Sequence, residues 1–92
     1  MNEKLGKGLQ ALYAGDLATA EEQFNKVIKD EPLNADAYFY RGKTRWQNGE
    51  LTPAMSDFNK TLSINPLHNQ AKVSLAMIKN ILGFRNPDLY NP

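Results

Sequence analysis

The chain has 92 residues, which is enough for one domain with a modest hydrophobic core. Its 11 lysines and arginines nearly balance its 10 aspartates and glutamates, and no run of like charge exceeds two residues, so neither a nucleic-acid-binding stripe nor a membrane-surface patch is expected. The lack of cysteine excludes disulfides, thiolate zinc sites and a cysteine nucleophile. No apolar run resembles a signal peptide or approaches the roughly 18 residues of a membrane span, which favours a soluble cytoplasmic protein.

Apolar residues recur every three or four positions, and no alternating strand pattern of useful length occurs, so an all-helical chain is expected. Five helices are predicted in chain order: Glu3–Ala14, Leu17–Lys29, Ala35–Asn48, one that begins near Pro53, and Asn69–Leu82.

Glycines and prolines punctuate these segments. Gly15, Gly49 and Gly83 stand where the first, third and fifth helices are expected to end, because a left-handed residue commonly closes a helix. Pro32 and Pro66 are expected to stop the second and fourth helices.

Two helix starts have capping signals. Asn34 is expected to cap the third helix. Thr52 is expected to cap the fourth, with Pro53 as its first residue and Leu51 packing as a hydrophobic staple.

The chain repeats itself at an interval of 34 residues, most visibly in FNKVIKDEPLN and FNKTLSINPLH. Small residues recur where the two helices of a hairpin must approach closely, and an aromatic residue recurs where it would fill the space between them. The identical pairs are Gly8/Gly42, Gly15/Gly49, Leu17/Leu51, Ala20/Ala54, Phe24/Phe58, Asn25/Asn59, Lys26/Lys60, Pro32/Pro66 and Leu33/Leu67.

This pattern resembles the tetratricopeptide repeat, a 34-residue helix-turn-helix unit with a small residue at position 8, alanine at 20, an aromatic at 24 and proline at 32. The large residues of the family's first helix are less faithful here, since Lys4, Lys7 and Arg45 occupy such positions. The resemblance implies a right-handed stack of antiparallel helix pairs. It divides the single domain into repeat one (1–34), repeat two (35–68), a partial third repeat (69–83) and a tail (84–92).

Catalysis and metal binding are not expected. The only histidine is His68, with no evident nucleophile near it in the sequence, and scattered carboxylates do not supply a ligand set at helical spacing. We therefore predict no enzyme activity, no cofactor and no metal.

A nucleic-acid role is also disfavoured. Arg41, Lys43 and Arg45 lie near aromatic residues, but residues two apart on a helix point to different faces, so surface solubility explains these cations better.

The resemblance allows a second test, since some repeats of this family grip a peptide's C-terminal carboxylate through charged and amide side chains. The corresponding residues here carry no charge, so this clamp is not supported. They are Leu5, Leu9, Tyr40, Gln70 and Ser74.

The resemblance also implies a concave groove lined by the first helices. An apolar strip there is typical of an interaction surface, although in so short a stack the leucines could instead pack on one another. We predict a non-catalytic module that binds a peptide or helical segment of a partner protein, with homodimerisation through the groove or the open ends as the alternative. The predicted partner-binding residues are Leu5, Leu9, Leu12, Phe39, Lys43, Trp46, Val73 and Met77.

The last predicted helix has two apolar faces. One, which includes Ala71, Leu75 and Ile78, is expected to pack on the preceding hairpin, while Val73 and Met77 belong to the other. The tail FRNPDLYNP is expected either to fold back over the end of the stack or to fray.

Overall fold

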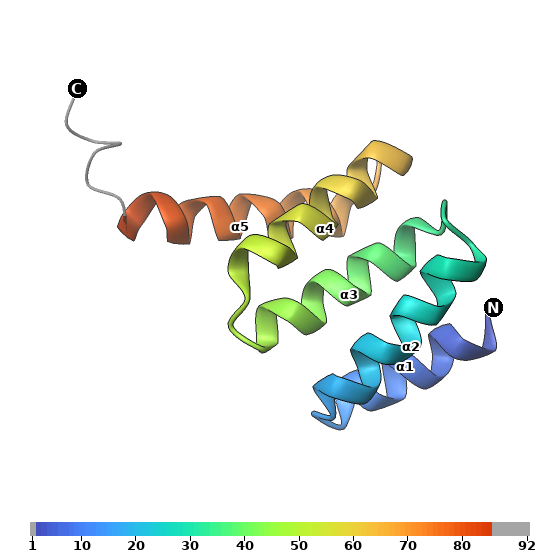
Figure 1. The fold of residues 1–92 in the computed structure, drawn as a ribbon. Coiled ribbons are helices and arrows are strands. Elements are labelled where there is room, and N and C mark those ends of the chain that lie inside the picture. Colours follow the sequence, from blue (N-terminus) through green and yellow to red (C-terminus); the bar gives the residue numbers. More distant parts are fainter. Residues whose placement is uncertain (1, 86–92) are drawn as a thin grey trace.

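The computed structural model describes residues 2–85, which form five α-helices and no strand (Figure 1). The helices are α1 (Glu3–Tyr13), α2 (Leu17–Asp30), α3 (Ala35–Gln47), α4 (Leu51–Ile64) and α5 (Asn69–Arg85). Each helix packs against the next one along the chain, and α1 also touches α3. The predicted all-α stack of helix hairpins is confirmed.

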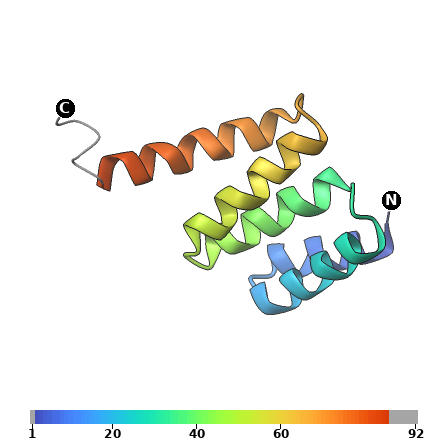
Figure 2. The same cartoon turned by 45° about the horizontal axis from the view of Figure 1, so that its top comes forward.

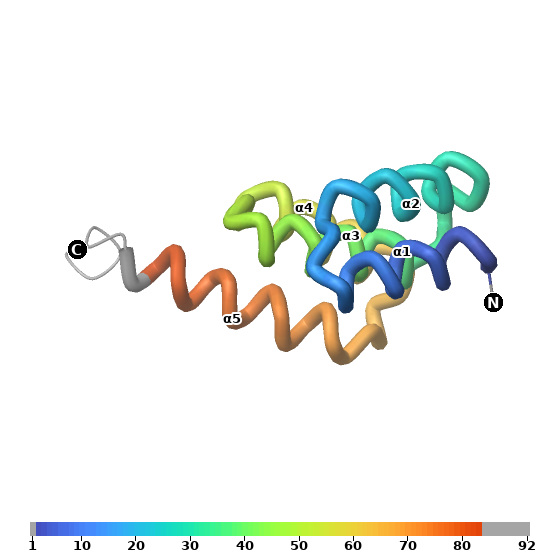
Figure 3. The backbone as a smooth tube through the Cα atoms, turned by 90° about the horizontal axis from the view of Figure 1, so that it is seen from below, coloured from blue at the N-terminus to red at the C-terminus, as the bar shows by residue number. Residues whose placement is uncertain are grey.

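The stack has two sides and one open end. Figure 3 shows α2 and α4 on one side and α5 on the other. In Figure 2, α5 runs on past the end of α4, so its C-terminal part extends beyond the rest of the stack.

Each hairpin is centred on one phenylalanine. Phe24 and Phe58 are completely buried, as predicted. The fit is tight because a Cβ atom added to Gly42 would lie only 2.7 Å from Phe58 Cε1, and Gly8 faces Phe24 in the same way. The small residues at these positions are therefore required by the closeness of the paired helices.

The core has two parts, one in each half of the stack. The first consists of Leu5, Leu12, Ala20, Phe24, Val27 and Ala37. The second consists of Phe39, Ala54, Phe58, Ala71, Leu75 and Ile78. Tyr40 packs against both parts and so connects them. Burial raises the pKa of its phenol above the ordinary value, and electrostatic interactions with the nearby Tyr13 and Asp36 raise that pKa further.

Two of the three predicted glycine ends are confirmed. Gly15 and Gly49 have φ angles of 83° and 80°, the left-handed conformation that follows a helix. The prediction for Gly83 is wrong, since α5 continues through it to Arg85. Glycine also adopts the right-handed helical conformation, at a cost of about 1 kcal/mol relative to alanine.

The predicted start of α4 is also wrong. The helix begins at Leu51, so Pro53 is its third residue, and Glu50 precedes it without a side-chain capping bond. Proline is tolerated there because the first four N–H groups of a helix have no partner within it. Asn34, by contrast, caps α3 as predicted, accepting a hydrogen bond from the Ala37 N–H at 3.1 Å.

The two faces of α5 are confirmed. Ala71, Leu75 and Ile78 are buried in the second core, whereas Val73 and Met77 are 52% and 50% exposed. The predicted docking or fraying of the tail concerns mainly residues 86–92, which lie outside the described residues; the backbone of residues 84 and 85 belongs to α5.

Candidate functional site

A groove of about 650 Å³ lies between α3 and the first half of α5. Helical spacing brings the residues of each wall to one face, at intervals of three and four along α3 and α5. The groove is lined by Phe39, Lys43, Trp46, Gln47, Asn69, Gln70, Val73, Ser74 and Met77.

The α3 wall is continuous with the core. Phe39 is only 3% exposed, and its ring lies 5.7 Å from that of Phe58. Trp46 is partly buried and meets Phe58 edge-on at 6.2 Å. Lys43 lies beside them, with its Nζ 5.8 Å from the centre of the Phe39 ring, a cation–π contact. This wall is therefore mainly aromatic, with one positive charge and the amide of Gln47.

The α5 wall supplies the exposed apolar surface. Val73 and Met77 are half exposed because α5 turns its opposite face toward α4. No described helix covers this wall, so the two side chains present apolar surface directly to the groove.

His68 fixes the start of α5 next to the groove. Its Nδ1 accepts a hydrogen bond from the Ala71 N–H at 3.1 Å, so its Nε2–H donates to Asp36 Oδ1, also at 3.1 Å. The ring also packs on Phe39, with centroids 4.8 Å apart. Sequence reasoning missed this role, although the repeat held the signal, because His68 stands 34 residues after the capping Asn34.

The structure places five of the eight predicted partner-binding residues around this groove: Phe39, Lys43, Trp46, Val73 and Met77. Phe39 is 3% exposed and belongs to the second core, so it offers a partner little surface of its own. The other three are leucines of α1. Leu5 and Leu12 are 6% and 3% exposed and belong to the first core, and Leu9 packs against that core. The expected exposed leucine strip is therefore wrong for Leu5 and Leu12, because the hairpin partner α2 and the neighbouring α3 cover this side of α1.

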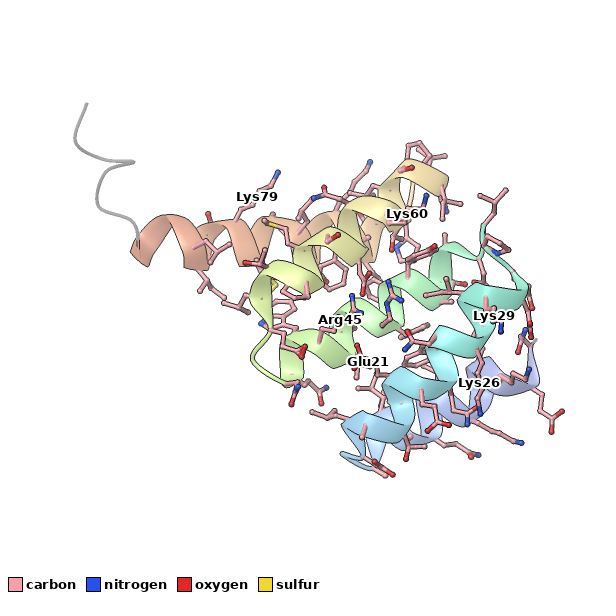
Figure 4. All side chains as sticks on the ribbon, in the orientation of Figure 1. Glu21, Lys26, Lys29, Arg45, Lys60 and Lys79 are labelled. Carbon is pink, nitrogen blue, oxygen red and sulfur yellow. The ribbon has the colours of Figure 1, made fainter. Side chains whose placement is uncertain are left out.

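The remaining cations of α3 serve a structural role. Arg41 donates to both carboxylate oxygens of Asp57, at 3.0 Å and 2.7 Å, and Arg45 binds Asp57 at 3.1 Å and Glu21 at 2.7 Å. Figure 4 shows Arg45 and Glu21 facing one another from α3 and α2. The explanation of these arginines as solubility residues is therefore wrong, since they join α2, α3 and α4.

Charge pairing within this cluster stabilises the charged guanidinium. Burial lowers the pKa of Arg41, but the hydrogen bond and charge of Asp57, together with Tyr38 and Glu21, outweigh burial and raise that pKa overall. Asp57 itself is 3% exposed in its side chain, and sequence reasoning missed it as a buried charge. The equivalent residue of the first repeat, Gln23, gives no hint of it.

Residues 2–85 contain no cluster of three or more histidine, cysteine, aspartate or glutamate side chains that could hold a metal ion. Within the same residues, no helix combines the length and hydropathy that a membrane span requires.

Comparison with known proteins gives the same repeat over most of this chain. Residues 5–69 match the family model described as tetratricopeptide repeat. A tetratricopeptide repeat protein 36 homolog of Nematostella vectensis is 34% identical over 65 residues, which are 71% of this chain and 36% of that protein. Tetratricopeptide repeat protein 36 of Mus musculus is 34% identical over 59 residues, 64% of this chain and 32% of that protein.

A more distant relative covers a longer part of the chain. A DnaJ homolog subfamily C member 7 homolog of Schizosaccharomyces pombe is 24% identical over 75 residues, 82% of this chain and 16% of that protein. The chain thus spans at most 36% of the length of these relatives. The family match and the paired helices around Phe24 and Phe58 agree, and this chain belongs to the tetratricopeptide repeat family.

Proposed function

We propose that this chain is a non-catalytic interaction module whose groove between α3 and α5 binds a short segment of a partner protein. Repeats of this family are generally protein–protein interaction modules, which supplies the class of function. The single observation that favours this groove is that Val73 and Met77 remain half exposed opposite the aromatic wall of Phe39 and Trp46.

The dimensions suit a few side chains of an extended or helical segment. The volume of about 650 Å³ falls within the range of roughly 300–1,000 Å³ that is usual for ligand sites. Covering the exposed halves of Val73 and Met77 would contribute roughly 1 kcal/mol each, given about 1.5–3 kcal/mol for burying a whole apolar side chain. Trp46, a residue type that is common among binding hot spots, is the expected anchor.

Selection from a display library of random peptides tests this proposal. Peptides enriched on the wild-type chain should shift the NMR signals of the Trp46 indole and of the Val73 and Met77 methyl groups. Met77→Glu should abolish this binding, because it places a charge in the apolar wall. Leu33→Glu is the matched control, since Leu33 is 75% exposed and lies outside the groove. Failure to enrich any peptide, or shifts confined to α2 and α4, would overturn the proposal.

Self-association is the second candidate, and the same half-exposed side chains favour it, because two copies could cover each other's α5 face. Light scattering over a range of concentrations distinguishes the two candidates. A dimer that Met77→Glu dissociates and Leu33→Glu does not would identify the groove as the contact between copies.

A further inference from the structure

Lys43 differs from the other two cations of α3 in having no carboxylate partner among the described residues. Arg41 and Arg45 are both engaged by Asp57, and Arg45 also by Glu21. The ammonium of Lys43 lies over the Phe39 ring instead, in the groove. The charge that the groove offers to a ligand is therefore positive and unneutralised.

The surroundings of Lys43 do not offset this charge. No aspartate or glutamate lines the groove; apart from Lys43, its polar groups are amides, a hydroxyl and the indole N–H of Trp46. The whole of α5, from Asn69 to Arg85, contains no carboxylate. Next to the apolar wall formed by Phe39 and Trp46, a negative charge is attracted to the Lys43 ammonium more strongly than it would be in open water.

We infer, on the basis of the proposed function, that the segment bound in this groove carries an aspartate or glutamate beside two or more apolar side chains. The carboxylate pairs with Lys43, and the apolar side chains lie against Trp46, Val73 and Met77. The ring contact holds the ammonium at the groove wall, so the position of the carboxylate fixes the register of the segment.

A carboxylate suits this site better than a phosphate group does. Phosphorylated side chains are commonly bound by clusters of arginine, whose planar guanidinium makes paired hydrogen bonds to phosphate oxygens. Both arginines of α3 already bind carboxylates within the chain. The single lysine that is left is a point charge, which one carboxylate neutralises.

Charge reversal tests the inference on the full chain. The probe is a display library of random 12-residue peptides, selected in parallel on the wild-type chain, Lys43→Glu and Lys79→Glu. Lys79 is the matched control because it is on α5, does not line the groove and projects away from the rest of the stack in Figure 4. Both variants change the net charge of the chain by the same amount.

The inference predicts that peptides from the wild-type chain and from Lys79→Glu combine apolar residues with an acidic one, and that Lys43→Glu selects a basic residue there. For one enriched acidic peptide, Lys43→Met should weaken binding by about two- to fivefold, as for a partly exposed ion pair. Raising the salt concentration from about 0.05 M to 0.5 M should weaken wild-type binding, with little effect on the Met variant.

The failures of the two proposals are distinguishable. Enriched peptides that map to the groove but lack an acidic residue, or that Lys43→Glu leaves unchanged, overturn the inference and leave the proposed function standing. If no peptide is enriched, both fall. A wild-type dimer that Lys43→Glu dissociates would make a second copy the occupant, and nuclear Overhauser contacts from the Trp46 ring to Leu89 or Tyr90 would make it the chain's own C-terminal residues. Either result overturns the acidic partner.

Discussion

Asp57 of α4 accepts hydrogen bonds on both carboxylate oxygens from Arg41 of α3, at 3.0 Å and 2.7 Å. The Asp57 side chain is 3% exposed, and that of Arg41 is 17% exposed. A charge so nearly removed from water is tolerated only because it is paired and hydrogen-bonded. The contact between the second pair of helices thus depends on one polar pair as well as on Phe58.

Asp57→Ala is expected to destabilise the fold by about 3–5 kcal/mol, because it leaves the partly buried guanidinium groups of Arg41 and Arg45 without their shared partner. Urea denaturation followed by circular dichroism measures this loss. Glu22→Ala is the control: Glu22 pairs with Lys26 at 3.3 Å on the exposed surface of α2, and its removal should cost less than about 1 kcal/mol. Equal losses in the two variants would show that the buried pair has no special weight.

Gly6 of α1 and Gly42 of α3 should respond in opposite ways to substitution by alanine. Gly42→Ala would place its Cβ 2.7 Å from Phe58 Cε1 and 3.2 Å from Asp57 Cβ, so overpacking should destabilise the chain by about 1–3 kcal/mol. Gly6→Ala meets no atom within 4 Å and should stabilise α1 by up to about 1 kcal/mol. Thermal melts of both variants check this pair, and a stabilising Gly42→Ala would contradict the tight contact.

The stability of the fold should depend on pH in the acidic range because of Asp16. Asp16 caps α2, and its side chain accepts a hydrogen bond from the Thr19 N–H at 3.2 Å. Hydrogen bonds from the Thr19 side chain and backbone hold the pKa of the Asp16 carboxyl below its ordinary value of 3.8. A carboxyl whose pKa is depressed by folding stabilises the fold above its unfolded pKa, and this contribution is lost as the pH falls through the folded pKa. NMR titration of the Asp16 carboxyl carbon should give a midpoint below 3.8.

The comparison variant for that titration is Asp16→Asn, which keeps a capping oxygen but cannot ionise. The stability gap between wild type and this variant should change between about pH 5 and pH 2 and stay constant at higher pH. A gap that does not vary with pH would mean that Asp16 acts only through its shape.

Substitutions in the core should mainly reduce stability, and substitutions in the groove should mainly reduce peptide binding. Phe58→Ala is expected to cost about 3–5 kcal/mol because Phe58 is completely buried. Met77→Ala should cost no more than about 1 kcal/mol, since half of that side chain is already in water, yet it should weaken peptide binding. Trp46→Ala should fall between them in stability, because its ring also packs on Phe58. Chemical denaturation together with peptide titration measures both effects, and equal stability losses at Met77 and Phe58 would contradict the groove.

The features that the sequence predicted well are those set by residues close together in the chain. The glycine turns at Gly15 and Gly49 and the buried Phe24 and Phe58 follow from local backbone preference and helical spacing. The same spacing identified the exposed face of α5, because Ala71 and Ile78 lie on the side of this helix that packs into the second core, and Val73 and Met77 lie on the other side.

The features that it did not predict depend on contacts between distant segments. Leu5 and Leu12 have the pattern of a groove strip, and only the closeness of α2 and α3 shows that they are covered. Asp57 looks like a surface carboxylate until Arg41 and Arg45 are brought to it from another helix. The predicted start of α4 is too late because proline is tolerated throughout the first turn of a helix, so Pro53 fits the third position as well as the first.

Arg45 joins the two repeats by binding Glu21 of α2 and Asp57 of α4 at once, whereas α5 has apolar contacts and the His68 hydrogen bond to Asp36. In a repeat protein, cooperativity is set by the coupling between neighbouring units. The buried ion pairs therefore couple α2, α3 and α4, whereas α5 is held mainly by its apolar residues in the second core. Because α5 supplies one wall of the groove, the groove exists only while that helix is docked, and a ligand that binds there transfers part of its binding energy to holding the last helix in place.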